Sequence, residues 1–186
     1  MAASQGLLAA ADATDNPNVA CFALLAYGFA NRDADPTASY DVHRRGLRIA
    51  QHSGNRQVES HLAGGLARLA ATHGDPTDAF DFLTLAIRNF YDSGRFSLMP
   101  TPLAVLAAVF DRLGHYEPAA TISGFADNAF TRTANPELNT AITHLREVLG
   151  DEAYESLARA GENMTNAAMA TYAFDQIDRA GAQLLK

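Results

Sequence analysis

Residues 35–74 and 75–114 align with each other without a gap, and ten of the forty aligned pairs are identical. Each copy begins with Asp-Pro-Thr, carries Ser-Gly near its middle and ends in glycine. An aspartate before a proline is a helix-start signal, because the carboxylate caps free backbone N–H groups and the proline needs no hydrogen bond there. Glycine is the residue that most often ends a helix. The duplication therefore predicts two successive helical hairpins.

The same helix-start and helix-stop signals occur outside the duplication. Strand patterns, in which apolar and polar residues alternate, are missing from the sequence. Asn16-Pro17 and Asn135-Pro136 repeat the helix-start signal, and glycines that follow apolar helical stripes are read as stops: Gly54, Gly74, Gly94, Gly114, Gly150 and Gly161. A forty-residue hairpin unit is typical of tetratricopeptide-like and related α-solenoid repeats. We predict an all-α fold, a tetratricopeptide-like α-α superhelix of stacked hairpins in a single domain over residues 1–186.

The flanking segments are interpreted as partial repeats. A helix around 2–13 pairs with a helix in the segment 16–34 before the first full repeat, and a short helix in the segment 116–128 follows the second. Pro100 and Pro102 predict that the second helix of the second repeat begins late or is kinked. After residue 130 a turn-rich connector precedes helices at about 136–149, 151–160 and 166–185, so that residues of about 135–186 cap the stack.

Composition excludes several functions. The formal net charge is −7, from 14 basic against 21 acidic residues, and no basic run exceeds the pair Arg44 and Arg45, so nucleic-acid binding by this segment is not expected. No apolar run is long enough to cross a membrane, and the apolar run near the N-terminus is short and has no positively charged region before it. We therefore predict a cytoplasmic protein without membrane contact. The single cysteine, Cys21, is expected to be a small buried side chain.

Motifs for catalysis or cofactor binding are missing from the sequence: it has no phosphate loop, dinucleotide fingerprint, HExxH or CxxC. The six histidines are scattered. His43 and His52 share one helix but lie about two and a half turns apart, too far to share a metal, and each is expected to be solvated or to cap. We therefore expect no cofactor, no metal and no enzymatic activity of the chain itself.

Arg48 and Arg88 occupy the same position in the two repeats. One interpretation is a favourable interaction with the C-terminal end of their helices or a salt bridge between repeats. The other is a row of cations on a concave surface that grips an acidic ligand or peptide. The candidate partner or ligand surface comprises Arg48, Arg88, Asn89, Arg56 and Glu59, and the last three are otherwise read as solvated polar residues.

Two segments, "LGHYEPAATISGFA" and "LREVLGDEAYESLARAGENMT", resemble the C-terminal helical-repeat region of mycobacterial and other actinobacterial signalling regulators. In that family a class III cyclase-like or other sensor domain precedes a STAND-type ATPase module and a tetratricopeptide-like tail, and some members end in a LuxR-type DNA-binding motif. The chain lacks the cyclase aspartates, the Walker motif and the helix-turn-helix, so the resemblance implies a tail without an active site.

Two functional hypotheses follow. The first is a non-catalytic interaction or regulatory module that binds a protein partner or a neighbouring ATPase module, with self-association through an exposed apolar end as a further expectation. The second is a small-molecule sensor, in which a ligand occupies the repeat groove beside Asn89, Phe90 and Tyr91.

Overall fold

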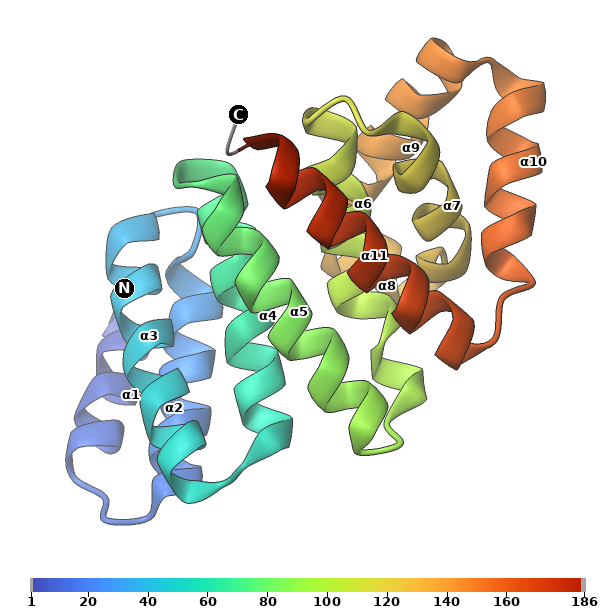
Figure 1. The fold of residues 1–186 in the computed structure, drawn as a ribbon. Helices are drawn as coiled ribbons and strands as arrows, with labels where there is room; N and C mark the ends of the chain where they lie inside the picture. Colours follow the sequence, from blue (N-terminus) through green and yellow to red (C-terminus); the bar gives the residue numbers. More distant parts are fainter. Residues whose placement is uncertain (1, 185–186) are drawn as a thin grey trace. The chain divides into compact units, whose positions relative to one another are not determined.

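The computed structural model describes residues 2–184, without the side chains of residues 2–5 and 76, and these residues form helices joined by short loops, with no strand among them. The all-α prediction is therefore confirmed (Figure 1). Within the described residues no helix is both long and apolar enough to cross a membrane.

The contacts of the chain divide it into two compact units, Met1–Asn89 and Phe90–Lys186, and the boundary falls inside one helix. The helices that begin in the first unit are α1 (Ala2–Asp12), α2 (Pro17–Asn31), α3 (Pro36–Ser53), α4 (Arg56–His73) and α5 (Pro76–Asp92). The second unit holds the 3₁₀ turn η1 (Phe96–Leu98), α6 (Pro100–Arg112), α7 (Tyr116–Ala126), α8 (Ala129–Ala134), α9 (Pro136–Leu149), α10 (Asp151–Glu162) and α11 (Asn166–Leu184). The expectation of a single domain stays a prediction.

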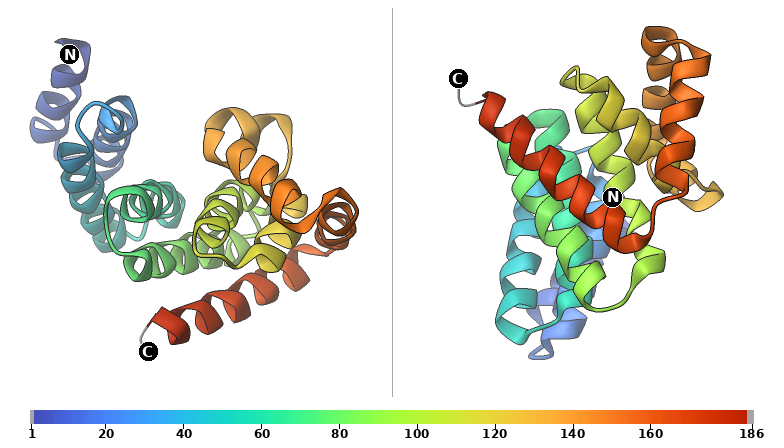
Figure 2. Two further views of the ribbon diagram at one scale, coloured as in Figure 1. Left: turned by 90° about the horizontal axis from the view of Figure 1, so that it is seen from above. Right: turned by 45° about the vertical axis from the view of Figure 1, so that its right-hand side comes forward.

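In the first unit, α1–α2 and α3–α4 are antiparallel hairpins that lie side by side, and α5 runs antiparallel to α4 (Figures 1 and 2). Their apolar faces meet in a core that includes Leu24, Leu47, Leu62, Leu66 and Leu83, all of them buried. Burying a leucine contributes roughly 1.5–3 kcal/mol relative to leaving it exposed. The predicted helices before and within the first repeat are thus confirmed.

Three of the four predicted N-caps act as caps. Asn16 accepts hydrogen bonds from the backbone N–H groups of Asn18 and Val19, Asp35 from that of Ala38 at 2.9 Å and Asp75 from that of Thr77 at 2.8 Å. Asn135 occupies the predicted position but does not cap, because its buried side chain donates to the carbonyl of Thr131 in the preceding helix instead.

The predicted late start of the second repeat's second helix is confirmed. Gly54 and Gly94 both adopt a left-handed φ of 69°, and α4 begins two residues after its glycine, whereas α6 begins only at Pro100, after η1. A proline at the first helical position tolerates its missing N–H, so the prolines set where α6 begins.

The second unit differs from expectation in two places. Residues 129–134 form the short helix α8 rather than a turn-rich connector, because Asn128 and Thr131 cap each other's backbone N–H groups. Gly161 lies inside α10 and does not end it. The final three helices match their predicted positions, although the expected end at residue 185 lies outside the described residues.

Gly161 lies where α10 packs so close to α7 that no side chain fits. A Cβ atom added at Gly161 would lie 1.8 Å from the carbonyl oxygen of Thr121, and one added at Gly124 would lie 2.0 Å from that of Ala158. Two glycines on facing helices therefore allow the two backbones to touch.

Candidate functional site

The exposed faces of α3 and α5 carry the same charge pattern. Asp41 and Arg48 on α3 correspond to Asp81 and Arg88 on α5, and all four side chains are exposed. Seven residues make about two helical turns, or about 10 Å, so that each aspartate and its arginine lie on one face of their helix. We call these four residues together with Arg44 the paired-helix face.

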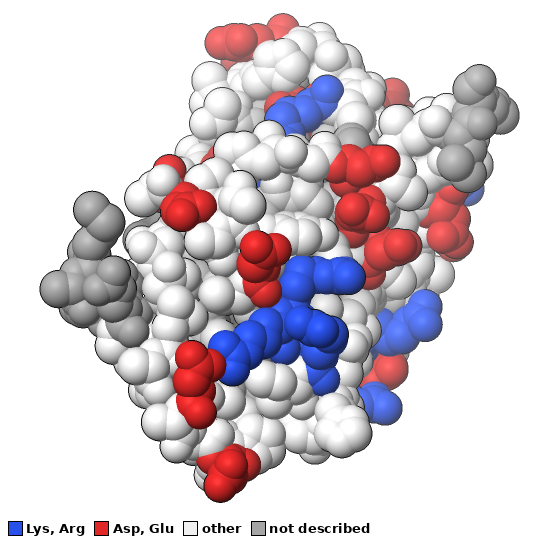
Figure 3. Space-filling view, turned by 90° about the vertical axis from the view of Figure 1, so that its left-hand side faces the viewer, with Lys and Arg blue, Asp and Glu red and all other residues white. Residues whose placement is uncertain are grey.

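Arg44 joins the two helices of the paired-helix face, because its guanidinium lies 5.9 Å from the centre of the Phe82 ring on α5. On the other side of α3, Arg45 forms an ion pair with Asp12 of α1 at 2.6 Å. Seen from the side, basic side chains gather in one area of the surface with acidic side chains around it (Figure 3). The three arginines of α3 lie within the five residues 44–48, although the chain as a whole has a formal net charge of −7.

The structure separates the five predicted surface residues into three groups. Arg48 and Arg88 are exposed on the paired-helix face, whereas Arg56 is exposed at the first position of α4. Asn89 is a correction: only 7% of its surface is exposed, and its side-chain amide donates a hydrogen bond of 2.8 Å to the carboxylate of Glu59. Asn89 and Glu59 therefore join α5 to α4 and are not two independent ligand contacts.

The alignment of the two repeats contains a signal that Asn89 is buried. Asn89 aligns with Ile49 of the first repeat, which packs against the core, so its position is an inward one. A buried amide needs a hydrogen-bond partner, and Glu59 supplies it. The ring of Phe90, expected to line a ligand groove, is also buried, while Tyr91 is partly exposed.

His43 contradicts the expectation of a solvated histidine, since only 1% of its surface is exposed. Its ring fits between Gly28 of α2 and Gly65 of α4, where added Cβ atoms would lie 2.1 Å and 2.4 Å from ring atoms. Nδ1 lies 2.8 Å from the carbonyl oxygen of Ser39, which only accepts, so Nδ1 carries the proton. Nε2 is then an acceptor and has no partner among the described residues. His52, in contrast, is exposed as expected.

Burial lowers the pKa of His43, the hydrogen bond to Ser39 partly offsets this shift, and the charge of Arg32 lowers the pKa further. The unfolded chain, with a histidine pKa near 6.5, therefore binds more protons than the folded one as the pH falls below that value. The contribution of His43 to the free energy of unfolding is therefore retained above about pH 6.5 and decreases below it, with a limiting slope of about 1.4 kcal/mol per pH unit for one proton.

We expect His43→Leu to reduce this pH dependence, because it removes the titratable imidazole. Leucine should fit the position, since the second repeat holds Leu83 at the equivalent position. Urea unfolding between pH 5 and pH 8 measures it. His52→Leu, a change of an exposed side chain on the same helix, should leave the pH dependence as in the unchanged chain. Equal pH dependence of the His43→Leu variant and the unchanged chain would contradict the assignment.

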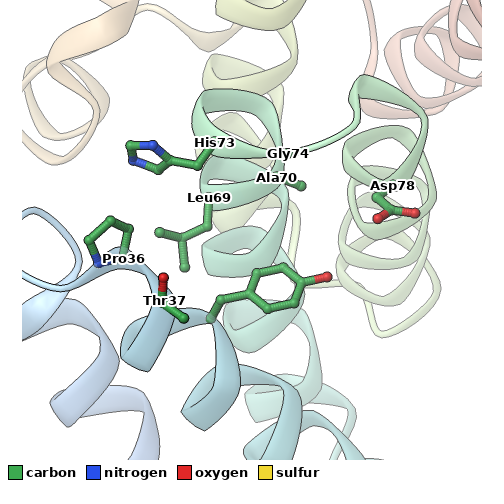
Figure 4. Close-up of a pocket in the computed structure, with 8 residues that line it drawn as sticks. Pro36, Thr37, Leu69, Ala70, His73, Gly74 and Asp78 are labelled. Atoms are coloured by element: carbon green, nitrogen blue, oxygen red, sulfur yellow. The ribbon is translucent and has the colours of Figure 1, made fainter.

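A pocket of about 340 Å³ opens where the start of α3, the end of α4 and the start of α5 meet (Figure 4). Its apolar wall is formed by Pro36, Leu69 and Ala70. Its polar groups come from all three helices, namely Thr37 and Tyr40 on α3, His73 on α4 and Asp78 on α5. His73 and Asp78 lie at opposite ends of the pocket (Figure 4).

Polar side chains join neighbouring helices in the second unit at two places. The buried carboxylate of Asp111 lies 2.8 Å from Nδ1 of His144, and the hydroxyls of Ser123 and Tyr154 are 3.2 Å apart. Burial raises the pKa of Tyr154, and the guanidinium of Arg146 lies 4.4 Å from its ring centre. These contacts join α6 to α9 and α7 to α10, which gives them a structural role.

Two further features carry no chemistry. Cys21 is fully buried as predicted, its thiol lies 3.5 Å from the carbonyl oxygen of Gly46, and burial raises its pKa, which disfavours the reactive thiolate.

On α2, Val19, Phe22 and Phe29 are about half exposed and the helix has no charged residue. This apolar stripe is the second protein-binding candidate on the first unit.

Comparisons with known proteins give no assignment: no family model, no curated protein and no solved structure matches the chain. Among the described residues, no group of three His, Cys, Asp or Glu side chains is arranged to hold a metal ion. The paired-helix face and the pocket are therefore the two candidate functional sites.

Proposed function

We propose that this chain is a non-catalytic helical-repeat interaction module and that its paired-helix face binds an acidic segment of a protein partner. The observation that carries the proposal is the repetition of an exposed arginine at the same position of both repeats, Arg48 and Arg88. Arg44 lies one turn before Arg48 on α3 and contacts the Phe82 ring of α5. Both arginines are exposed to solvent, and their recurrence on neighbouring helices favours a binding role.

Charge complementarity indicates which partner fits. The three arginines offer planar groups that form paired hydrogen bonds with carboxylates. Asp41 and Asp81 border them on the same face and would repel an extended polyanion such as a nucleic-acid backbone. A short acidic peptide can contact the arginines without crossing the aspartates, and we therefore favour a protein.

The resemblance to actinobacterial signalling regulators, which covers nearly the whole chain, suggests where the partner would lie. If the chain is the tail of an actinobacterial regulator, the acidic segment belongs to the neighbouring ATPase module or to a protein that controls it. Stacking of the hairpins into a tetratricopeptide-like superhelix, a cytoplasmic location and self-association belong to the same proposal.

The test is the affinity of the whole chain for a labelled octaglutamate peptide, measured by fluorescence anisotropy at low ionic strength. The double variant Arg48→Glu/Arg88→Glu should weaken binding at least about tenfold, because each change replaces an attraction by a repulsion, and about 1.4 kcal/mol corresponds to a factor of ten. Added salt should weaken binding by the unchanged chain, since exposed charges are screened.

The matched control is Arg112→Glu/Arg179→Glu, which changes the net charge equally at exposed positions of the second unit. It should bind almost as well as the unchanged chain. An equal loss in both double variants, or equal binding of a single-stranded oligonucleotide of the same charge, would contradict the proposal.

A second candidate function, small-molecule sensing, is favoured by one observation, the pocket of about 340 Å³ in the first unit. Its volume falls within the range of ordinary ligand sites, about 300–1,000 Å³. The ligand would thus lie at the start of α3 rather than beside Asn89 and Phe90, as the sequence interpretation expects.

A further inference from the structure

The pocket at the ends of α3, α4 and α5 has polar groups that the protein itself leaves unused. Among the described residues, the side chains of Thr37, Tyr40, His73 and Asp78 form no hydrogen bond and no ion pair with one another or with other residues. They line a hollow whose wall is apolar, with His73 and Asp78 at its opposite ends (Figure 4). An apolar hollow with a few convergent polar groups is the usual form of a small-molecule site.

The charges around the pocket indicate which charge a ligand should carry. Asp78 is a carboxylate in its lining, and the caps Asp35 and Asp75 place two more carboxylates at the starts of α3 and α5. Leu69, Ala70 and His73 belong to the last turn and a half of α4, where the backbone carbonyls give the helix end a partial negative charge. None of the described residues that line the pocket is a lysine or an arginine. The starts of α3 and α5 carry the partial positive charge of helix N-termini, and the capping carboxylates of Asp35 and Asp75 offset it. The carboxylate of Asp78 and the end of α4 then make the pocket favour a cation.

We propose that this pocket binds an organic ammonium group with a compact apolar body, with the ammonium at Asp78 and the apolar body against Leu69, Ala70 and Pro36. Tyr40 and Thr37 offer hydroxyls that accept further hydrogen bonds from the ammonium or contact the ligand body. His73, at the other end, offers a ring nitrogen to a polar group at the far end of the ligand. The site is independent of the paired-helix face.

Two sources share this chemistry, namely a free small amine and the side chain of a lysine from another protein. Phenethylamine serves as the probe for the first, and Nα-acetyl-lysine methylamide for the second. Titration of the ¹⁵N-labelled whole chain, followed by amide shifts in two-dimensional NMR, reports binding and its location.

For phenethylamine we expect shifts at residues 36–40, 69–74 and 78, with a dissociation constant on the order of 1 mM for so small a molecule. The neutral analogue 2-phenylethanol, which has the same shape, should bind about tenfold more weakly. Tighter binding of the lysine analogue than of phenethylamine would assign the site to a protein side chain, and the reverse would assign it to a free amine.

Asp78→Asn should weaken binding of the amines about tenfold and leave 2-phenylethanol unaffected. The matched control is Asp81→Asn, which removes the same charge from an exposed position one turn further along α5, outside the pocket. Equal loss in the two variants, equal binding of the amine and the alcohol, or absence of shifts at the lining residues would overturn the proposal. Each variant is first checked for an unchanged melting temperature.

Discussion

Replacing Gly161 by alanine should destabilise the second unit by about 3 kcal/mol or more, at the upper end of what overpacking costs. The added methyl group would lie 1.8 Å from the carbonyl oxygen of Thr121, and a backbone atom cannot rotate away as a side chain can. α7 and α10 must therefore separate, which opens the contact between them. Urea unfolding followed by circular dichroism measures the loss.

The control for this change is Gly181→Ala in α11, because a methyl group at that helical position meets no atom within 4 Å. It should be neutral or raise the free energy of unfolding by up to about 1 kcal/mol, the usual gain of alanine over glycine in a helix. A Gly161→Ala variant as stable as Gly181→Ala would show that α7 and α10 are not in backbone contact.

Replacing Gly65 by alanine should destabilise the first unit by about 2–3 kcal/mol. The methyl group would lie 2.4 Å from Nε2 of His43, and the ring cannot retreat because Gly28 is packed against its other side and Ser39 holds Nδ1. Gly64→Ala is the control, since the neighbouring glycine has no atom within 4 Å of its added Cβ.

A double-mutant cycle separates this clash from a general effect on α4. His43→Ala removes the ring and is itself destabilising, but it should make Gly65→Ala much less harmful, with a coupling of about 1 kcal/mol or more. Additive effects of the two changes would contradict the packing of His43 against Gly65.

The helices were predictable because their signals are local. Asp35 and Asp75 cap the next turn of chain, and Gly54 and Gly94 adopt left-handed backbone at the predicted helix ends. Gly161 was misread because nothing in its neighbourhood in the sequence announces that α7 touches α10 there. Asn135 was misread for a similar reason, since its partner Thr131 lies in a helix that the sequence did not predict.

The site was predictable only as far as the duplication reaches. The recurrence of Arg48 and Arg88 identified two exposed cations, and the alignment of Asn89 with Ile49 marks Asn89 as an inward residue. The pocket depends on three helix ends that come together in space. His43 also depends on tertiary packing, because two glycines from other helices make room for its ring.

The most direct test of the proposed function is the location of bound octaglutamate on the ¹⁵N-labelled whole chain, mapped by NMR amide shifts. We predict that the shifts concentrate on α3 and α5 around Arg44, Arg48 and Arg88 and vanish in the Arg48→Glu/Arg88→Glu variant. Shifts concentrated on the apolar stripe of α2 or on the second unit, or shifts that persist in that variant, would contradict the account.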